Sequence, residues 1–170
     1  MTEEACYYLN KLLLRSSSLT TLNLTGCKIG IEGARRLVQG ISNAIALRHL
    51  ILRQCNLRNE GFHYIVKSLA ANALLEHLDV SENFLDEGSA EDMDKLILEC
   101  QSLKSVNFSW NNLYAKEMCE KLFKALISNG TITLVDLSWN SMRNESVSSL
   151  CNFIRKSEIL SNLNLECTVI

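Results

Sequence analysis

The chain has no proline and only 7 glycines in 170 residues. Linkers between domains are often rich in these two residues, so the composition marks no domain boundary. We therefore expect residues 1–170 to form a single domain. The sequence also lacks a signal-peptide pattern and any apolar run long enough to cross a bilayer, so no membrane partner is expected.

Concentrated positive charge is missing as well. The chain carries 17 Lys and Arg residues against 19 Asp and Glu residues, which gives a net charge of -2, and its basic residues form no long run. A surface that follows a phosphate backbone needs a concentrated basic patch. The sequence therefore predicts no nucleic-acid partner.

Two cysteine patterns are absent: an even set typical of disulfide-bonded proteins, and a Cys-x-x-Cys pair. An odd set of 7 cysteines without a signal peptide favours a reducing, intracellular setting. Asn-x-Ser/Thr sequons would suggest secretion, but those at Asn23 and Asn107 fall on expected strands, where glycans would crowd the inner surface. We therefore expect a cytoplasmic protein.

Signatures of catalysis are not found either. The segment 26–33 is rich in glycine, but it lacks the spacing and the Lys-Ser/Thr ending of a phosphate-binding loop. The sequence shows no nucleophile paired with a base. It also shows no pair of carboxylates that could act together in an enclosed catalytic pocket. We expect no enzymatic activity, no cofactor, no metal and no small-molecule substrate.

The sequence does contain a repeat. Residues 103–113 read Leu-Lys-Ser-Val-Asn-Phe-Ser-Trp-Asn-Asn-Leu, with apolar residues at positions 1, 4, 6 and 11 and a polar residue at position 9. The same template begins at residues 19, 47, 75, 103, 132 and 160, which are 28, 28, 28, 29 and 28 residues apart. A sustained period of this length is typical of solenoid proteins. Residues 1–18 then form a partial repeat, and residues 160–170 form an incomplete one that ends its core pattern at Ile170.

Each repeat predicts a short strand followed by an amphipathic helix. In residues 31–43 the apolar side chains recur at helical spacing, as they do in the last helix, where we expect Val147, Leu150, Cys151 and Ile154 on the buried face. Strands joined by helices pair in parallel through right-handed connections. Helices are bulkier than strands, so the stack must curve with the sheet on its concave side.

Position 9 holds Asn83, Asn111 and Asn140, while Cys27 and Cys55 occupy it in the first two repeats. We expect these side chains to satisfy buried backbone groups rather than to act in redox or metal chemistry. The pattern Leu-x-x-Leu-x-Leu-x-x-Asn/Cys-x-Leu, with a helix in every unit, resembles the ribonuclease-inhibitor-like subfamily of leucine-rich repeats. The resemblance implies an α/β leucine-rich repeat solenoid.

This resemblance also implies a non-enzymatic, protein-binding function. One possibility is a scaffold within a larger intracellular assembly of cytoskeletal or ciliary type. The alternative is a regulator that captures a ligand, such as a ribonuclease-inhibitor-like inhibitor or the sensor region of a NOD-like receptor.

Side chains at positions 3, 5 and 7 are expected on the open concave face, because residues alternate across a strand. Ser105 and Ser109 in the fourth repeat are therefore expected to be free to contact a partner. The candidate partner-binding residues on this face are His49, His77, Arg53, Asp79, Asn107 and Asp136.

Position 8 holds both tryptophans of the chain, Trp110 and Trp139, in consecutive repeats. Stacked strands lie about 4.8 Å apart, so the indoles should be neighbours at the rim of the concave face. They are either anchors for a partner, since Trp is enriched in binding hot spots, or covers for the edge of the core.

His49 and His77 share position 3 in adjacent repeats. Two imidazoles could bind a metal or respond to pH, but no third ligand shares their column, so two exposed polar residues are the simpler interpretation.

The two ends of the array are expected to expose apolar surface and unpaired strand edges. We therefore expect each end to dock against another chain, a second copy, or further parts of a longer protein.

Overall fold

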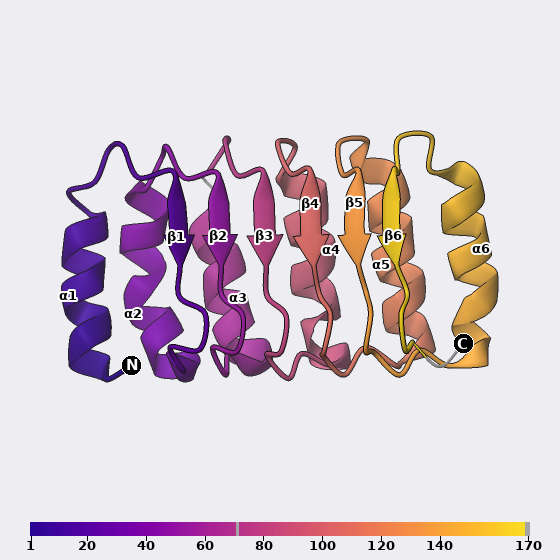
Figure 1. Cartoon of the computed structure of the whole chain (residues 1–170), viewed down its shortest axis with the longest axis horizontal. Helices are drawn as coiled ribbons and strands as arrows, with labels where there is room; N and C mark the ends of the chain where they lie inside the picture. The colour runs from indigo at the N-terminus through magenta and orange to yellow at the C-terminus, as the bar shows by residue number, and fades with distance from the viewer. Residues whose placement is uncertain (71, 169–170) are drawn as a thin grey trace.

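The computed structural model describes residues 1–70 and 72–168, so Ile170 lies outside the described residues. Short strands and helices alternate along the chain (Figure 1). The strands are β1 (Thr21–Asn23), β2 (His49–Ile51), β3 (His77–Asp79), β4 (Ser105–Asn107), β5 (Leu134–Asp136) and β6 (Asn162–Asn164). The helices are α1 (Glu3–Leu13), α2 (Gly30–Asn43), α3 (Arg58–Leu69), η1 (Glu87–Ser89), α4 (Ala90–Glu99), α5 (Lys116–Asn129), η2 (Asn144–Ser146) and α6 (Val147–Lys156).

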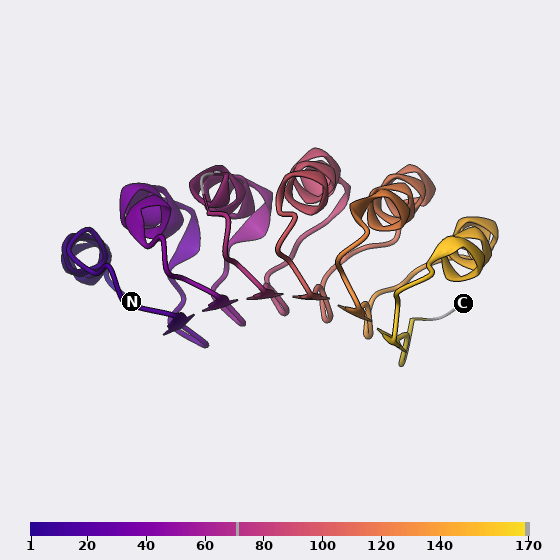
Figure 2. The same cartoon turned by 90° about the horizontal axis from the view of Figure 1, so that it is seen from above.

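The strands form one parallel sheet in the order β1-β2-β3-β4-β5-β6. Equivalent repeat positions face each other across each pair, so His49 pairs with His77 and Asp79 pairs with Asn107. Figure 2 shows the helices along the outer side of an arc and the sheet along its inner side. The expected α/β leucine-rich repeat solenoid, with a concave sheet and convex helices, is confirmed.

The core is a continuous strip between the sheet and the helices. The central residue of each strand is buried from β1 to β5, as is the position 6 residue that follows each of these strands. Apolar helix faces close the strip from the other side, for example through Leu37, Ile65 and Leu122. Each repeat therefore buries its apolar residues mainly against its neighbours.

Hydrogen bonds from the buried position 9 side chains join the repeats. Asn83 Nδ2 donates to the carbonyl oxygen of Leu52 in the preceding repeat at 2.8 Å, and Asn83 Oδ1 accepts from the backbone N–H groups of Cys55 and Leu57 at 3.1 Å. Cys55 Sγ makes the equivalent bond to the carbonyl of Leu24 at 3.1 Å. Burial raises the pKa of this thiol to about 12, so it stays protonated and able to donate. The structural role expected at position 9 is confirmed for these residues.

The expected buried face of the last helix is partly wrong. Cys151 and Ile154 are exposed, with Ile154 at 50% exposure, whereas Phe153 is buried and stacks on Phe123 with ring centroids 5.4 Å apart. The helix is turned so that its one aromatic residue fills the core. Cys151 and Ile154 then lie on a surface that no further helix covers among the described residues.

None of the helices in the described part of the chain is both long and apolar enough to span a membrane.

Replacing Asn83 with Ala should lower the free energy of unfolding by about 2–4 kcal/mol, because the N–H groups of Cys55 and Leu57 and the carbonyl of Leu52 lose this partner. Asn83→Cys should cost less, since a thiol can make the bond that Cys55 makes. Urea denaturation followed by circular dichroism measures both changes. The exposed Asn112→Ala is the control, and equal losses for Asn83→Ala and Asn112→Ala would contradict this role.

Candidate functional site

The loops that follow the strands form a rim beside the concave sheet, and their backbone places position 8 in the left-handed region. The φ angles in this column are all positive, between 52° and 71°. From the first repeat to the fifth, each position 8 N–H donates to the position 7 carbonyl of the next repeat, as Trp110 does to Ser138 at 2.9 Å and Trp139 does to Glu166 at 2.8 Å. The column consists of Gly26, Gln54, Glu82, Trp110, Trp139 and Cys167.

The two tryptophans are neighbours on this rim, as predicted. Trp110 and Trp139 stack with ring centroids 4.2 Å apart and an interplanar angle of 9°. They remain 49% and 41% exposed, respectively. The pair therefore presents a wide, flat, apolar surface to solvent.

Local backbone energetics does not favour tryptophan at these positions. The φ angles of Trp110 and Trp139 are 54° and 56°, a region that costs a residue with a Cβ about 1–2 kcal/mol. Glycine avoids this cost and occupies the same column at Gly26. Strained backbone that carries large exposed side chains is typical of positions used for binding.

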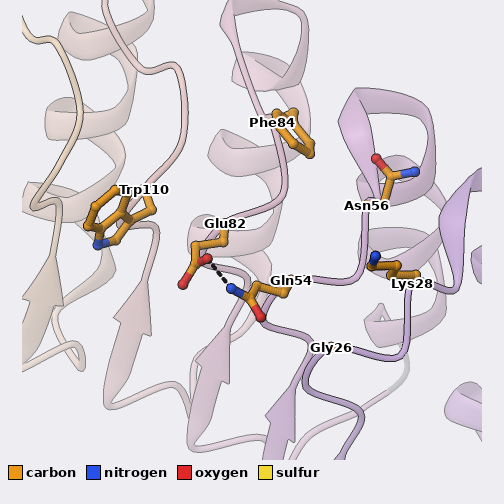
Figure 3. A pocket seen from close by; sticks show the side chains of 7 residues that line it. All are labelled: Gly26, Lys28, Gln54, Asn56, Glu82, Phe84 and Trp110. Atoms are coloured by element: carbon orange, nitrogen blue, oxygen red, sulfur yellow. Dashed lines mark hydrogen bonds between the residues drawn. The ribbon is translucent and has the colours of Figure 1, made fainter.

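A hollow of about 700 Å³ lies beside Trp110 on the rim (Figure 3). Phe84, which is 60% exposed and also has a positive φ, lines it as well. Phe84 belongs to position 10, and the sequence interpretation missed it. The signal that could have found it is a large apolar residue at a repeat position filled elsewhere by Lys28, Asn56 and Asn112.

Glu82 at the base of this hollow is held by two neighbours. Arg53 Nε donates to Glu82 Oε1 at 2.7 Å, and Gln54 Nε2 donates to Glu82 Oε2. The predicted site residue Arg53 is therefore exposed but already engaged in an ion pair, which leaves the hollow close to neutral at its base.

The position 5 candidates on the concave face have a structural task that the sequence interpretation did not foresee. Asp79 Oδ1 accepts from the N–H and hydroxyl of Ser81, and Asp136 Oδ1 accepts from those of Ser138. Asn107 Oδ1 accepts from the N–H of Ser109 at 2.9 Å. These bonds hold the turn that leads each strand into the rim. The recurrence of Asp or Asn two residues before Ser or Thr was the signal for it.

The expectation that Ser109 lies open on the concave face was wrong. It was expected to be free for a partner, but it is only 6% exposed. The N–H of Ser109 donates the turn bond to Asn107 Oδ1, and its side chain lies under the rim, so the alternation that holds within β4 fails where the strand ends. Ser105 remains half-buried and accepts or donates a hydrogen bond with His77 Nδ1 at 2.6 Å.

His49 and His77 stack on the concave face of β2 and β3, with ring centroids 4.5 Å apart and an interplanar angle of 19°. Nearly parallel rings direct their nitrogen lone pairs along parallel planes, so the two cannot converge on one ion at the roughly 2.0–2.1 Å of a zinc–nitrogen bond. Among residues 1–70 and 72–168, no group of three or more His, Cys, Asp or Glu residues is placed to hold a metal. The two stacked imidazole rings thus form a polar aromatic patch on the concave face.

The repeats of this chain are similar to those of known proteins. The Leucine Rich repeat family model matches residues 15–38, 99–113 and 128–151. Mouse "NACHT, LRR and PYD domains-containing protein 5" is 27% identical over 164 residues, which cover 92% of this chain and 14% of that protein. Human "NACHT, LRR and PYD domains-containing protein 14" is 28% identical over 157 residues, covering 91% of this chain and 14% of that protein. The chain thus spans only a small part of the length of these relatives.

Two solved structures share the arc. The tropomodulin C-terminal domain of Caenorhabditis elegans superposes with a TM-score of 0.67 at 19% identity, covering 91% of this chain and 95% of that domain. A structure described as leiomodin-1 actin-binding site 2 superposes with a TM-score of 0.70 at 14% identity, covering 92% and 89%. At these identities the likeness concerns the fold alone.

Stability should fall in mild acid through the histidine pair. Burial, and then the nearby charge of His49, lower the pKa of His77 below its ordinary value of 6.5. The unfolded chain therefore binds more protons than the folded one as the pH drops below about 6.5, so the free energy of unfolding decreases there. Urea denaturation between about pH 7.5 and pH 5.5 measures this slope.

The variant His77→Phe keeps an aromatic ring in the stack and should remove part of the slope. His63 is not part of this stacked pair: it is exposed, and its Nδ1 lies 3.0 Å from Asp92 Oδ1. If His77→Phe kept the slope of the unmodified protein, the pair would not be the cause.

Proposed function

We propose that this chain, which has a leucine-rich repeat fold, is a non-enzymatic scaffold that binds protein partners through its concave face and rim. The stacked, exposed pair of Trp110 and Trp139 is the observation that carries this proposal. Large rigid aromatic side chains give apolar contact area at small entropic cost, so they dominate many protein interfaces.

The other candidate residues make the rest of the proposed contact surface polar. Asp79 and Asp136 each use one carboxylate oxygen to hold the turn, and Asp136 Oδ2 also accepts from Asn164 Nδ2 at 3.1 Å, so these two residues add negative charge to the concave face. Asn107 lies between them in the sheet. We assign His49, His77 and Arg53 to the N-terminal part of the same contact surface.

A protein partner suits this surface better than other ligands. The rim hollow is open and bordered by acidic, basic and apolar side chains, in contrast to the concave, water-excluding pockets that enzymes use. The same mixture of charges does not form the basic surface that nucleic acids require. The proposal therefore includes no catalysis, no nucleic acid and no membrane.

We further propose that the scaffold works in the cytoplasm, as part of a larger assembly of cytoskeletal or ciliary type. The thiol of Cys55 must stay reduced to donate its bond to Leu24, which suits a reducing compartment. The structure described as leiomodin-1 actin-binding site 2 has the same arc, and this supports an assembly of cytoskeletal type.

A ligand-capturing regulator is the second candidate. Sequence relatives whose names contain NACHT, LRR and PYD favour it, because their repeats belong to much longer proteins. In that case this arc would be the sensor region of a NOD-like receptor or a ribonuclease-inhibitor-like inhibitor. Affinity purification separates the two: structural proteins of an assembly support the scaffold, and one small basic enzyme supports the inhibitor.

Replacing both Trp110 and Trp139 with Ala should reduce the affinity for a purified partner by about a hundredfold or more, as expected for hot-spot residues of about 2 kcal/mol or more. Isothermal titration calorimetry measures the loss, and circular dichroism confirms the fold. The matched control is Ile45→Ala with Leu98→Ala, which removes exposed apolar groups away from the rim. Unchanged affinity in the folded Trp variant would sink the proposal.

We also propose that both ends of the arc pack against further protein. On α1 the side chain of Leu12 is 68% exposed beside exposed Tyr8, and on α6 Ile154 is 50% exposed. Exposed apolar groups gathered at the two ends favour such packing.

Light scattering at micromolar concentration should therefore find self-association of the 170-residue chain. Tyr8→Ser with Leu12→Ser should reduce it, whereas Leu98→Ser on α4 should not. A monodisperse, freely soluble monomer would contradict the proposal for the ends.

A further inference from the structure

The stacked indoles of Trp110 and Trp139 leave ring surface free for a ligand, because each ring covers one face of the other. The two residues remain 49% and 41% exposed in the stack. After Trp139 the position 8 column continues with Cys167, whose side chain is too short to cover an indole. Within the described part of the chain, the rim therefore presents an open π-surface at Trp139.

The charged groups around this surface have one sign. At positions 3 to 10 of the third to sixth repeats the sequence has no Lys or Arg, and burial keeps the pKa of His77 below its ordinary value, so this ring is neutral at pH 7. Four carboxylates occupy the same positions. They are Asp79, Glu82, Asp136 and Glu166.

Three of these carboxylates keep their full charge. Glu82 is neutralised by Arg53, whose Nε donates to it at 2.7 Å. Asp79 and Asp136 accept hydrogen bonds from serine and asparagine groups, which are neutral and do not cancel a charge. Among residues 1–70 and 72–168, no Lys, Arg or His forms an ion pair with Asp79, Asp136 or Glu166.

The basic residues of the fourth and fifth repeats that come closest in sequence are used elsewhere. Lys104 precedes its strand, at the end of the sheet opposite the rim, and its Nζ donates to Glu76 at 2.6 Å. Arg143 lies beyond the rim at position 12, over the ring of Tyr114 at 5.4 Å from the centroid. Neither cation offsets the carboxylates of the concave face.

Lys28 lines the hollow beside Trp110, but it belongs to the first repeat. Trp139 belongs to the fifth repeat, and four steps of about 4.8 Å in the sheet separate the two by about 19 Å. The Trp139 end of the stacked pair is therefore the end at which a ligand meets carboxylates without a cation.

Two carboxylate residues lie next to Trp139. Its N–H donates to the backbone carbonyl of Glu166 at 2.8 Å, which places these residues side by side in adjacent repeats. Asp136 Oδ1 accepts from the N–H of Ser138, the residue before Trp139, at 2.9 Å. An indole face attracts a cation, and a guanidinium can stack flat on the ring while its edge donates to carboxylates.

We propose that the tryptophan pair binds an arginine side chain on a basic segment of a partner protein. The guanidinium stacks on the indole of Trp139 and donates to Glu166 and Asp136. A further basic side chain of the segment faces Asp79, which lies two steps, or about 10 Å, from Asp136 along the position 5 column. This inference rests on the proposed function, because it assigns a partner chemistry to the same surface. An acidic segment would meet three carboxylates with like charge.

Isothermal titration calorimetry with four nonapeptides tests the proposal. All are acetylated and amidated, so their ends carry no charge. The first carries several Arg residues among Gly and Ser, and the others replace each Arg with citrulline, Leu or Glu. Citrulline keeps the shape of arginine without its charge. The arginine peptide should bind at least about tenfold more tightly than the other three. Equal or tighter binding of any other peptide, or no binding of the arginine peptide, would overturn the proposal.

Removal of the charges gives the sharper test. Asp136→Asn with Glu166→Gln should weaken the arginine peptide by about tenfold or more. Asn holds the same turn at Asn107, so this variant keeps the fold, as circular dichroism can verify. Glu99→Gln with Glu120→Gln, on exposed positions of α4 and α5, makes the same change in net charge and should have no effect. Equal affinities for the two variants would contradict the site.

The contribution of the indole is tested separately. Trp139→Leu keeps a large apolar side chain but removes the π-surface, so it should weaken the arginine peptide by about threefold or more. An unchanged affinity would show that the guanidinium does not stack on this ring, and the proposal would be wrong.

The outcomes separate this inference from the proposed function. If the alanine variant of Trp110 and Trp139 loses a protein partner while the arginine and citrulline peptides bind equally well, the scaffold stands and the arginine site is wrong. If that variant keeps its partner and the arginine peptide does not bind, both are wrong.

Discussion

One hydrogen bond, made from position 9 to the position 6 carbonyl of the preceding repeat, fixes how the second to fifth repeats each sit on the repeat before them. Asn111 makes it to Val80 at 3.2 Å, and Asn140 makes it to Phe108 at 3.0 Å. A strand that ends after three residues leaves backbone groups inside the protein without partners, and an unpaired buried group costs about 1–3 kcal/mol. The amide of Asn meets several of these groups at once. The turn, the stacking of repeats and the position of the rim all depend on this bond.

A second set of bonds explains why recognition falls to the rim rather than to the sheet. Side chains such as Asp136 hold the turn from within, which buries Ser138 and uses part of the polar surface of the concave face. The chain then enters left-handed conformations, and the side chains there point away from the core. Position 8 can therefore change between Gly26, Glu82 and Trp110 without disturbing the core, which frees it for binding.

Most of the fold could be predicted from the sequence, because leucine spacing reports directly on which residues face the core. The register of β4 and β5 and the contact between Trp110 and Trp139 followed from the period alone. The part that could not be predicted depends on turn geometry. The burial of Ser109 and the hollow beside Phe84 depend on loop dihedral angles, which the spacing of apolar residues does not report. The exposure of Cys151 likewise depends on how the last helix turns to bury an aromatic ring.

Intrinsic fluorescence gives the most direct test of the claim that the rim binds protein, because Trp110 and Trp139 are the only tryptophans of the chain. Their emission reports on the rim and on no other surface. In the free protein, the half-exposed pair should emit at long wavelength and be quenched readily by acrylamide. A bound partner that lacks tryptophan should shift the emission to shorter wavelength and protect it from acrylamide. If binding is established by calorimetry and both signals stay unchanged, the partner contacts another surface and the account of the rim is wrong.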